Sequence, residues 1–193
     1  MTTSLKVSRR LDWTLHSVRF FKNHFLLIFG LGLVAALGRA TQLGAFGQIP
    51  SGLHILVEAV VNVARLLIFL YALGLTNVRT GAIRLAALFT NNRSRRQNWQ
   101  LASQKLRAEW AAILLNLIVF LLIAFLINLL IDHIAYQTCM YAKLKAGNII
   151  SGQASEWTLI LFYKNISVIP FTLIFNALFC LWLINRLPKS VRY

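Results

Sequence analysis

The sequence has few acidic residues and lacks the familiar catalytic motifs. Only 5 Asp and Glu stand against 20 Lys and Arg, which gives a formal net charge of +15. There is no HExxH, no GxSxG, no GxGxxG, and no GxxxxGK followed by Ser or Thr. Asp12 and Asp132 fall on opposite sides of the membrane in the topology below, so the chain also lacks a pair of intramembrane aspartates. We therefore expect a protein that is not an enzyme and needs no cofactor.

Cysteine is also scarce. Cys139 and Cys180 are the only two, no CxxC pattern occurs, and the topology below puts them near opposite faces of the membrane. Because the two sulfur atoms of a disulfide must come within bonding distance, we expect no intramolecular disulfide. The same absence of CxxC argues against a structural metal or a redox role, and we predict structural thiols.

Long apolar runs are what the sequence has in abundance. Residues 111–131 carry no formal charge, and Asn116 and Asn128 are their only amides. At about 1.5 Å of rise per residue, a helix of this length crosses the roughly 30 Å hydrocarbon core of a bilayer. The run is apolar on every face, which is rare in a helix of a soluble domain. It is predicted to be a transmembrane helix.

Three further runs resemble it. Together the sequence predicts an all-α integral membrane protein with four transmembrane helices, in a chain whose residues are 58% hydrophobic and 13% charged. Pro170, near the middle of the last span, is expected to kink it. The first span also imitates a signal peptide, but its basic leader is too long and Arg39 sits badly at a cleavage site. The spans are expected at about 25–43, 53–75, 110–131 and 157–184, within one transmembrane domain of residues 25–193.

Residues 1–24 form a basic arm before the first span. Leu11, Leu15, Val18 and Phe25 recur at helical spacing, and five Lys and Arg share the segment with Asp12. This pattern is typical of an amphipathic helix that lies in the membrane interface with its basic face toward lipid headgroups. A merely solvated basic tail is the alternative.

The connection at 76–109 is the most basic, with seven Lys and Arg and a single acid, Glu109. We expect a helical hairpin: the second span continues to about 89, the chain turns at 90–98, and it returns from Trp99 into the third span. The hairpin and the arm together carry a basic patch that would face anionic lipid headgroups or a protein partner. The patch comprises Arg9, Arg10, Arg93, Arg95 and Arg96.

The distribution of Lys and Arg indicates the orientation. The arm, the hairpin and the C-terminal tail carry five, seven and three, whereas the other two connections hold only Arg39, Lys143 and Lys145. By the positive-inside rule, both termini and the hairpin face the cytoplasm, in the cytoplasmic (inner) membrane. Because the basic residues flank apolar spans and no nucleic-acid motif accompanies them, we do not expect nucleic acid as a partner.

The second span holds the unusual polar residues. His54, Glu58, Asn62 and Arg65 are separated by four, four and three residues, which places them within an arc of roughly 80° on one helix face. Lys164 and Asn165 of the fourth span lie at a similar expected depth. Because an intramembrane charge is costly, Arg65 should face protein or water. Glu58 can offset it through Asn62 or a water, and the expected depths also allow an ion pair between Glu58 and Lys164.

This polar stripe has several interpretations. Its side chains could hold the bundle together, or bind an anionic lipid or small anion, or carry protons. A metal site made by His54, Glu58, Asp132 and His133 is a weaker hypothesis, since adjacent residues point in different directions on a helix.

Three functions follow from these observations. The leading prediction is a non-enzymatic accessory or scaffold subunit of a membrane complex, with a protein partner or a second copy of itself. The first alternative is a small permease or transporter component that binds an anion at the stripe. An intramembrane enzyme that uses Glu58, Asp132 or His133 is the second alternative.

Overall fold

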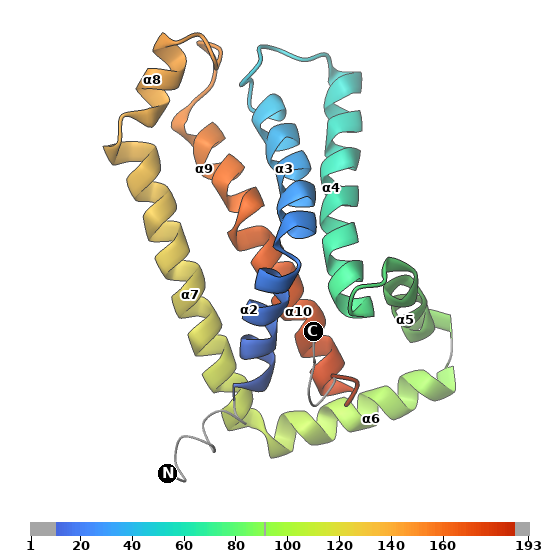
Figure 1. Cartoon of the computed structure of the whole chain (residues 1–193). Coiled ribbons are helices and arrows are strands. Elements are labelled where there is room, and N and C mark those ends of the chain that lie inside the picture. Colours follow the sequence, from blue (N-terminus) through green and yellow to red (C-terminus); the bar gives the residue numbers. More distant parts are fainter. Residues whose placement is uncertain (1–10, 91, 188–193) are drawn as a thin grey trace. The chain divides into compact units, whose positions relative to one another are not determined.

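The computed structural model describes residues 11–90 and 92–187, and within these ranges every regular element is a helix. Figure 1 shows the helices in chain order. Apolar residues recur on all sides of the longest ones, so helix is the structure that satisfies their backbone groups in lipid. The helices are α2 (Asp12–Asn23), α3 (Phe25–Gln42), α4 (Ser51–Gly74), α5 (Val78–Thr90), α6 (Asn92–Ala108), α7 (Trp110–Gln137), α8 (Met140–Ala146), α9 (Glu156–Ile166) and α10 (Val168–Leu183).

Four stretches are long and apolar enough to cross a membrane, which confirms the four predicted spans. They are Phe25–Gln42, Ser51–Gly74, Trp110–Gln137 and Glu156–Leu183. Three of them end within about two residues of the predicted positions. The third, α7, continues six residues past Ile131, so Asp132 and His133 lie inside the helix and not at its end. The architecture is that of a multi-pass membrane protein.

The fourth span is broken in two at Ser167. Pro170 has no backbone N–H, and its ring crowds the carbonyl of Ile166 four residues earlier, so the helix cannot run through. α9 ends at Ile166 and α10 begins at Val168. The hydroxyl of Ser167 donates to the carbonyl oxygen of Tyr163 at 2.7 Å, so the polar side chain at the break has a hydrogen-bond partner. The kink expected at Pro170 is thus a break three residues before it.

The basic connection differs from the predicted hairpin. α4 ends at Gly74, because Leu75 and Thr76 adopt positive φ angles of 50° and 83°. The side chain of Asn77 then accepts a hydrogen bond from the N–H of Thr80 at 3.2 Å and starts α5. Residues 92–98, predicted as a turn, belong to α6. The second span therefore does not continue to Phe89, and the predicted boundaries inside this connection were wrong.

The chain divides into two compact units, each built from several segments. Unit 1 comprises Met1–Phe25, Ile68–Leu122 and Phe171–Tyr193, and unit 2 comprises Leu26–Leu67 and Ile123–Pro170. We describe each unit by itself.

The core of unit 1 is aromatic. Trp13 of α2 is 1% exposed and packs against three rings of α10, those of Phe175, Phe179 and Trp182, with centroid distances of 6.1, 5.2 and 4.5 Å. Large rings bury the most apolar area per residue, so Trp13 fixes which face of α2 turns inward.

The two sides of α2 differ in how far the rest of the protein buries them. Its inward residues are Trp13, Thr14, Ser17 and Phe20, whereas Leu15 and Val18 are 38% and 43% exposed. The aliphatic spacing therefore identified the outer side of the helix. That α2 lies along the membrane interface stays a prediction.

Asn116 of α7 caps the N-terminus of α2. Its side-chain oxygen accepts the backbone N–H of Thr14 at 3.2 Å and the Thr14 hydroxyl at 2.6 Å, and Asn116 is fully buried. The first N–H groups of a helix have no partner within it, and Leu11 at the N-cap provides no side-chain cap. One of the two amides in the apolar run thus satisfies a buried donor on another helix.

Gly81 allows α5 to approach the end of α4 within unit 1. A Cβ atom added at Gly81 would overlap the carbonyl group of Leu70. We expect Gly81→Ala to destabilise the protein by about 2 kcal/mol or more, because rigid backbone must shift to make room. Gly30 has nothing within 4 Å of the same position, so Gly30→Ala is the control and should not destabilise. Thermal midpoints in detergent measure both, and equal effects would contradict the close approach.

His24 makes unit 1 sensitive to pH. Its ring nitrogen Nδ1 lies 3.1 Å from the hydroxyl of Tyr71, and burial lowers the pKa of His24 below its ordinary value of 6.5. Because the unfolded chain then binds this proton more readily, stability should be complete above about pH 6.5 and fall as the pH drops through the folded-state pKa. Thermal midpoints measured across this range should show the fall in the native chain and a smaller one in His24→Phe. If His24→Phe shows the same pH dependence as the native chain, a group other than His24 causes the fall in stability.

Small residues set the packing of unit 2. Ala35, Val61 and Ala64 form a buried cluster, and a Cβ at Gly38 would strike the side chain of Val61. A Cβ at Gly32 would lie 3.0 Å from the carbonyl oxygen of Asn165. Small residues let helices approach closely in lipid, so α3 lies near both α4 and α9. This brings the polar side chains of the three helices together.

Candidate functional site

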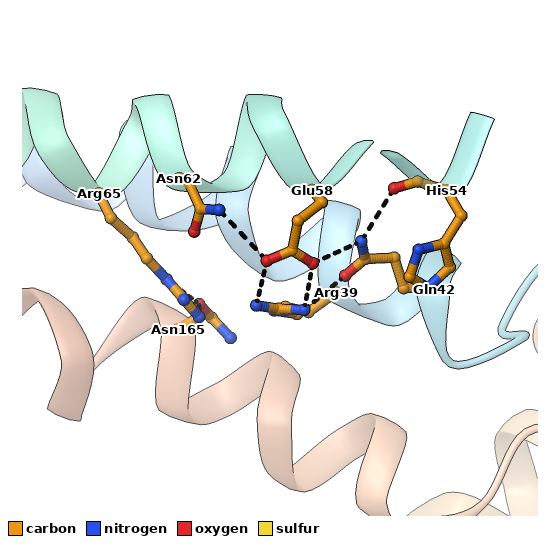
Figure 2. Close-up of polar contacts among 7 residues, drawn as sticks. All are labelled: Arg39, Gln42, His54, Glu58, Asn62, Arg65 and Asn165. Atoms are coloured by element: carbon orange, nitrogen blue, oxygen red, sulfur yellow. Dashed lines mark hydrogen bonds and ion pairs between the residues drawn. The ribbon is translucent and has the colours of Figure 1, made fainter. Parts of the chain in front are cut away.

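The polar stripe of α4 meets polar side chains from two other helices of unit 2. Figure 2 shows Arg39 and Gln42 of α3 and Asn165 of α9 around the stripe. His54, Glu58, Asn62 and Arg65 follow one side of α4, as their spacing predicted.

An ion pair between Arg39 and Glu58 is at the centre of the site. Arg39 donates from Nη1 to Oε2 at 2.9 Å and from Nη2 to Oε1 at 3.0 Å. The two side chains are 26% and 37% exposed. A two-point contact between a guanidinium and a carboxylate is charge-assisted and fixes the geometry of both partners. It therefore joins α3 to α4.

Two amides complete the coordination of the carboxylate. Gln42 donates from Nε2 to Oε2 of Glu58 at 3.0 Å, and Asn62 donates from Nδ2 to Oε1 at 3.2 Å. Gln42 also accepts from Arg39 at 2.7 Å and donates to the backbone carbonyl of His54 at 3.2 Å. Each oxygen of Glu58 thus accepts two hydrogen bonds, and the imidazole of His54 is exposed. His54 takes part through its backbone.

Of the contacts considered for Glu58, the one with Asn62 is present and the ion pair with Lys164 is not. Among the described residues, Arg39–Glu58 is the one ion pair, and Lys164 forms no ion pair or hydrogen bond there. Sequence reasoning missed Arg39 and Gln42. A signal existed, because Arg39 is a charged residue inside the predicted first span and Gln42 follows it by three positions.

Arg65 is held by Asn165. Its Nε and Nη2 both donate to the side-chain oxygen of Asn165, at 3.2 and 2.7 Å. Asn165 is 1% exposed and donates in turn to the carbonyl of Leu161 at 2.7 Å. The amide of Asn165 is neutral, and no carboxylate of the described residues forms an ion pair with Arg65. With Arg39 and Arg65 positive and Glu58 negative, the cluster carries +2 − 1 = +1.

Most of the predicted basic patch lies outside the described part of the chain. Arg9 and Arg10 lie outside the described residues. Arg93 and Arg95 lie in α6, where their side chains are outside the described part, and Arg96 is exposed on the same helix.

Other sites suggested by the sequence are not assembled. Asp132 and His133 are exposed on α7, and Glu58 already has its full set of donors. In the described part of the chain, no group of three His, Cys, Asp or Glu is placed to hold a metal ion. Cys139 and Cys180 are exposed and unbridged.

Comparisons of the chain with family models, with curated proteins and with solved structures find no match.

Proposed function

We propose that the chain is a non-enzymatic accessory or scaffold subunit of a complex in the cytoplasmic membrane. In this proposal the polar stripe has a structural role and joins α3, α4 and α9 of unit 2. Both termini and the basic α5–α6 connection face the cytoplasm, in accord with the excess of Lys and Arg there.

The observation that carries the proposal is the saturation of Glu58. A carboxylate that transfers protons or binds a cation needs a lone pair that is open to the ligand. Both oxygens of Glu58 instead accept two hydrogen bonds each, from Arg39, Gln42 and Asn62. Such a saturated pair favours helix packing over chemistry.

The exposed polar groups of α4 support an association with another chain. Asn62 is exposed on a spanning helix, with Val63 and Leu66 exposed nearby. Asn62 donates from Nδ2 to Glu58, but among the described residues its side-chain oxygen accepts no hydrogen bond. Hydrocarbon offers no donor to that oxygen, whereas a neighbouring helix does. A partner protein or a second copy of the chain would meet this need.

The mass of the native particle tests the proposal. The tagged chain, extracted in mild detergent, should give a particle of fixed stoichiometry by native mass spectrometry, heavier than the 21.9 kDa monomer. Asn62→Leu should weaken the association strongly, whereas the thermal midpoint of the monomer should fall only by the loss of one of the four hydrogen bonds to Glu58. Ile55→Leu, at an exposed apolar position of the same helix, is the matched control. A particle that is a stable monomer in every variant would refute the accessory role.

A permease component that binds an anion is the second candidate, and the uncompensated charge of Arg65 favours it. Inorganic phosphate is a suitable probe. Binding should raise the thermal midpoint of the native chain but not that of Arg65→Gln. If phosphate leaves the midpoint of the native chain unchanged, this candidate loses its support and the structural role of Arg65 remains.

A further inference from the structure

Helix α6 carries a strong positive charge with no acid of its own. Its 17 residues, NRSRRQNWQLASQKLRA, include five Lys and Arg and neither Asp nor Glu. Ala102 is its buried residue, at 7% exposure, and Lys105 is half-buried. The remaining described side chains leave a broad outer surface.

The outer surface of α6 is amphipathic. Trp99 is 68% exposed and Leu106 is 39% exposed, and because they are seven residues apart they point within roughly 20° of each other. Arg96 and Arg107 are exposed and lie roughly 60° to 100° further around the helix. An exposed tryptophan beside arginines is typical of a helix at the boundary between lipid headgroups and acyl chains.

Within unit 1, the chain connection to α7 and the side chain of Lys105 hold the C-terminal half of α6 at the ends of spanning helices. α7 begins at Trp110, two residues after α6 ends. Lys105 donates to the backbone carbonyl of Trp182 at 2.7 Å, and its ammonium lies 4.0 Å from the centre of the Trp182 ring, next to the end of α10. α6 is therefore tied to the boundary of the apolar region and not suspended on a long linker.

From this placement we infer that α6 binds the surface of anionic phospholipids. Trp99 and Leu106 insert among the upper acyl chains, and Arg96 and Arg107 contact headgroup phosphates. Charge complementarity selects the ligand, because five cations without a carboxylate attract an anionic surface and the exposed Trp99 adds an apolar anchor. The inference does not depend on the accessory role, and either can fail without the other.

Fluorescence of a label at position 99 tests the inference. The full chain, with Cys139→Ser and Cys180→Ser, receives an environment-sensitive nitrobenzoxadiazole label at Trp99→Cys. It is then placed in nanodiscs of phosphatidylcholine alone or mixed with phosphatidylglycerol. A label at Gln104→Cys, exposed and roughly 140° around the helix from position 99, is the control. Quenching by iodide reports the exposure of each label to water.

We expect the label at 99 to be shielded in the anionic discs and accessible in the neutral ones, with 104 accessible in both. Arg96→Gln with Arg107→Gln should weaken the attachment on the order of thirtyfold and restore quenching at 99. Lys143 and Lys145 are exposed on α8, and replacing both by Gln removes the same amount of charge. This control pair should not restore quenching at 99.

Three results would overturn the inference. Equal quenching at 99 and 104 in every disc would show that α6 does not dock on lipid. Equal shielding at 99 in neutral and anionic discs would remove the role of the headgroup charge. Shielding at 99 that persists in the anionic discs after Arg96→Gln with Arg107→Gln would assign the surface to a contact other than anionic headgroups.

Discussion

Glu58→Gln should destabilise the protein more than a double variant that replaces both Glu58 and its ion-pair partner Arg39. The single variant leaves the Arg39 guanidinium in a spanning segment without a counter-charge, although Gln42 and a neutral side chain at 58 remain beside it. A lone arginine in the membrane is unfavourable, by about 2.5 to 3.5 kcal/mol at the centre of a helix and less near its end. Arg39 lies three residues before the end of α3, so we expect an effect below that range.

The double variant Arg39→Met with Glu58→Gln removes the charge as well as its partner. Replacing both members of an ion pair is often close to neutral, whereas removing one is costly. Its thermal midpoint in detergent should therefore recover at least about half of the loss. Lys164→Gln is the control, because it removes a cation from a span without breaking an ion pair among the described residues, and it should leave the midpoint unchanged or raise it. If the double variant is less stable than Glu58→Gln, the ion pair with Arg39 is not the way in which Glu58 stabilises the protein.

Asn116→Leu should lower the free energy of unfolding by about 2 to 3 kcal/mol. Leucine has the same number and branching of side-chain heavy atoms as asparagine, although its methyl groups are larger, so the main chemical change is the loss of the acceptor for the Thr14 N–H and hydroxyl. Both groups are buried, and an unsatisfied buried donor costs about 1 to 3 kcal/mol. Denaturation in mixed detergent micelles measures the change.

Asn128→Leu is the matched control on the same helix. Asn128, like Asn116, donates to the backbone carbonyl four residues earlier, at 2.8 Å in both cases. The side-chain oxygen of Asn128 is buried and has no hydrogen-bond partner in the described part of the chain. Leucine there should therefore be neutral or stabilising. Similar losses in both variants would mean that the contact with Thr14 contributes little.

The spans could be predicted from the sequence because a span is recognised by its own length and apolar character. A run such as Ala111–Ile131 needs no knowledge of its neighbours to be assigned to lipid. The alignment of Glu58, Asn62 and Arg65 on one face was equally predictable, since it depends only on helical periodicity.

The partners within the site could not be predicted, because contacts between helices decide them. Glu58 pairs with Arg39 and not Lys164, since Gly38 lets α3 lie close to α4 at that level. The contact of Trp13 with the rings of α10 could not be predicted for the same reason. Periodicity assigns residues to a side of α2, but it does not say which other helix that side meets. The end of α4 at Gly74 depends on positive φ angles at Leu75 and Thr76, which are uncommon for these residue types.

Cysteine accessibility in intact cells tests the central claim most directly, which is that four helices cross the membrane with α6 on the cytoplasmic side. On the background with Cys139→Ser and Cys180→Ser, Gly152→Cys and Gln104→Cys would be treated separately with a membrane-impermeant maleimide. The account predicts labelling at 152 from outside and labelling at 104 only after permeabilisation. Labelling at 104 with protection at 152 would reverse the orientation, and labelling of both from outside would contradict the crossing of the membrane by α7.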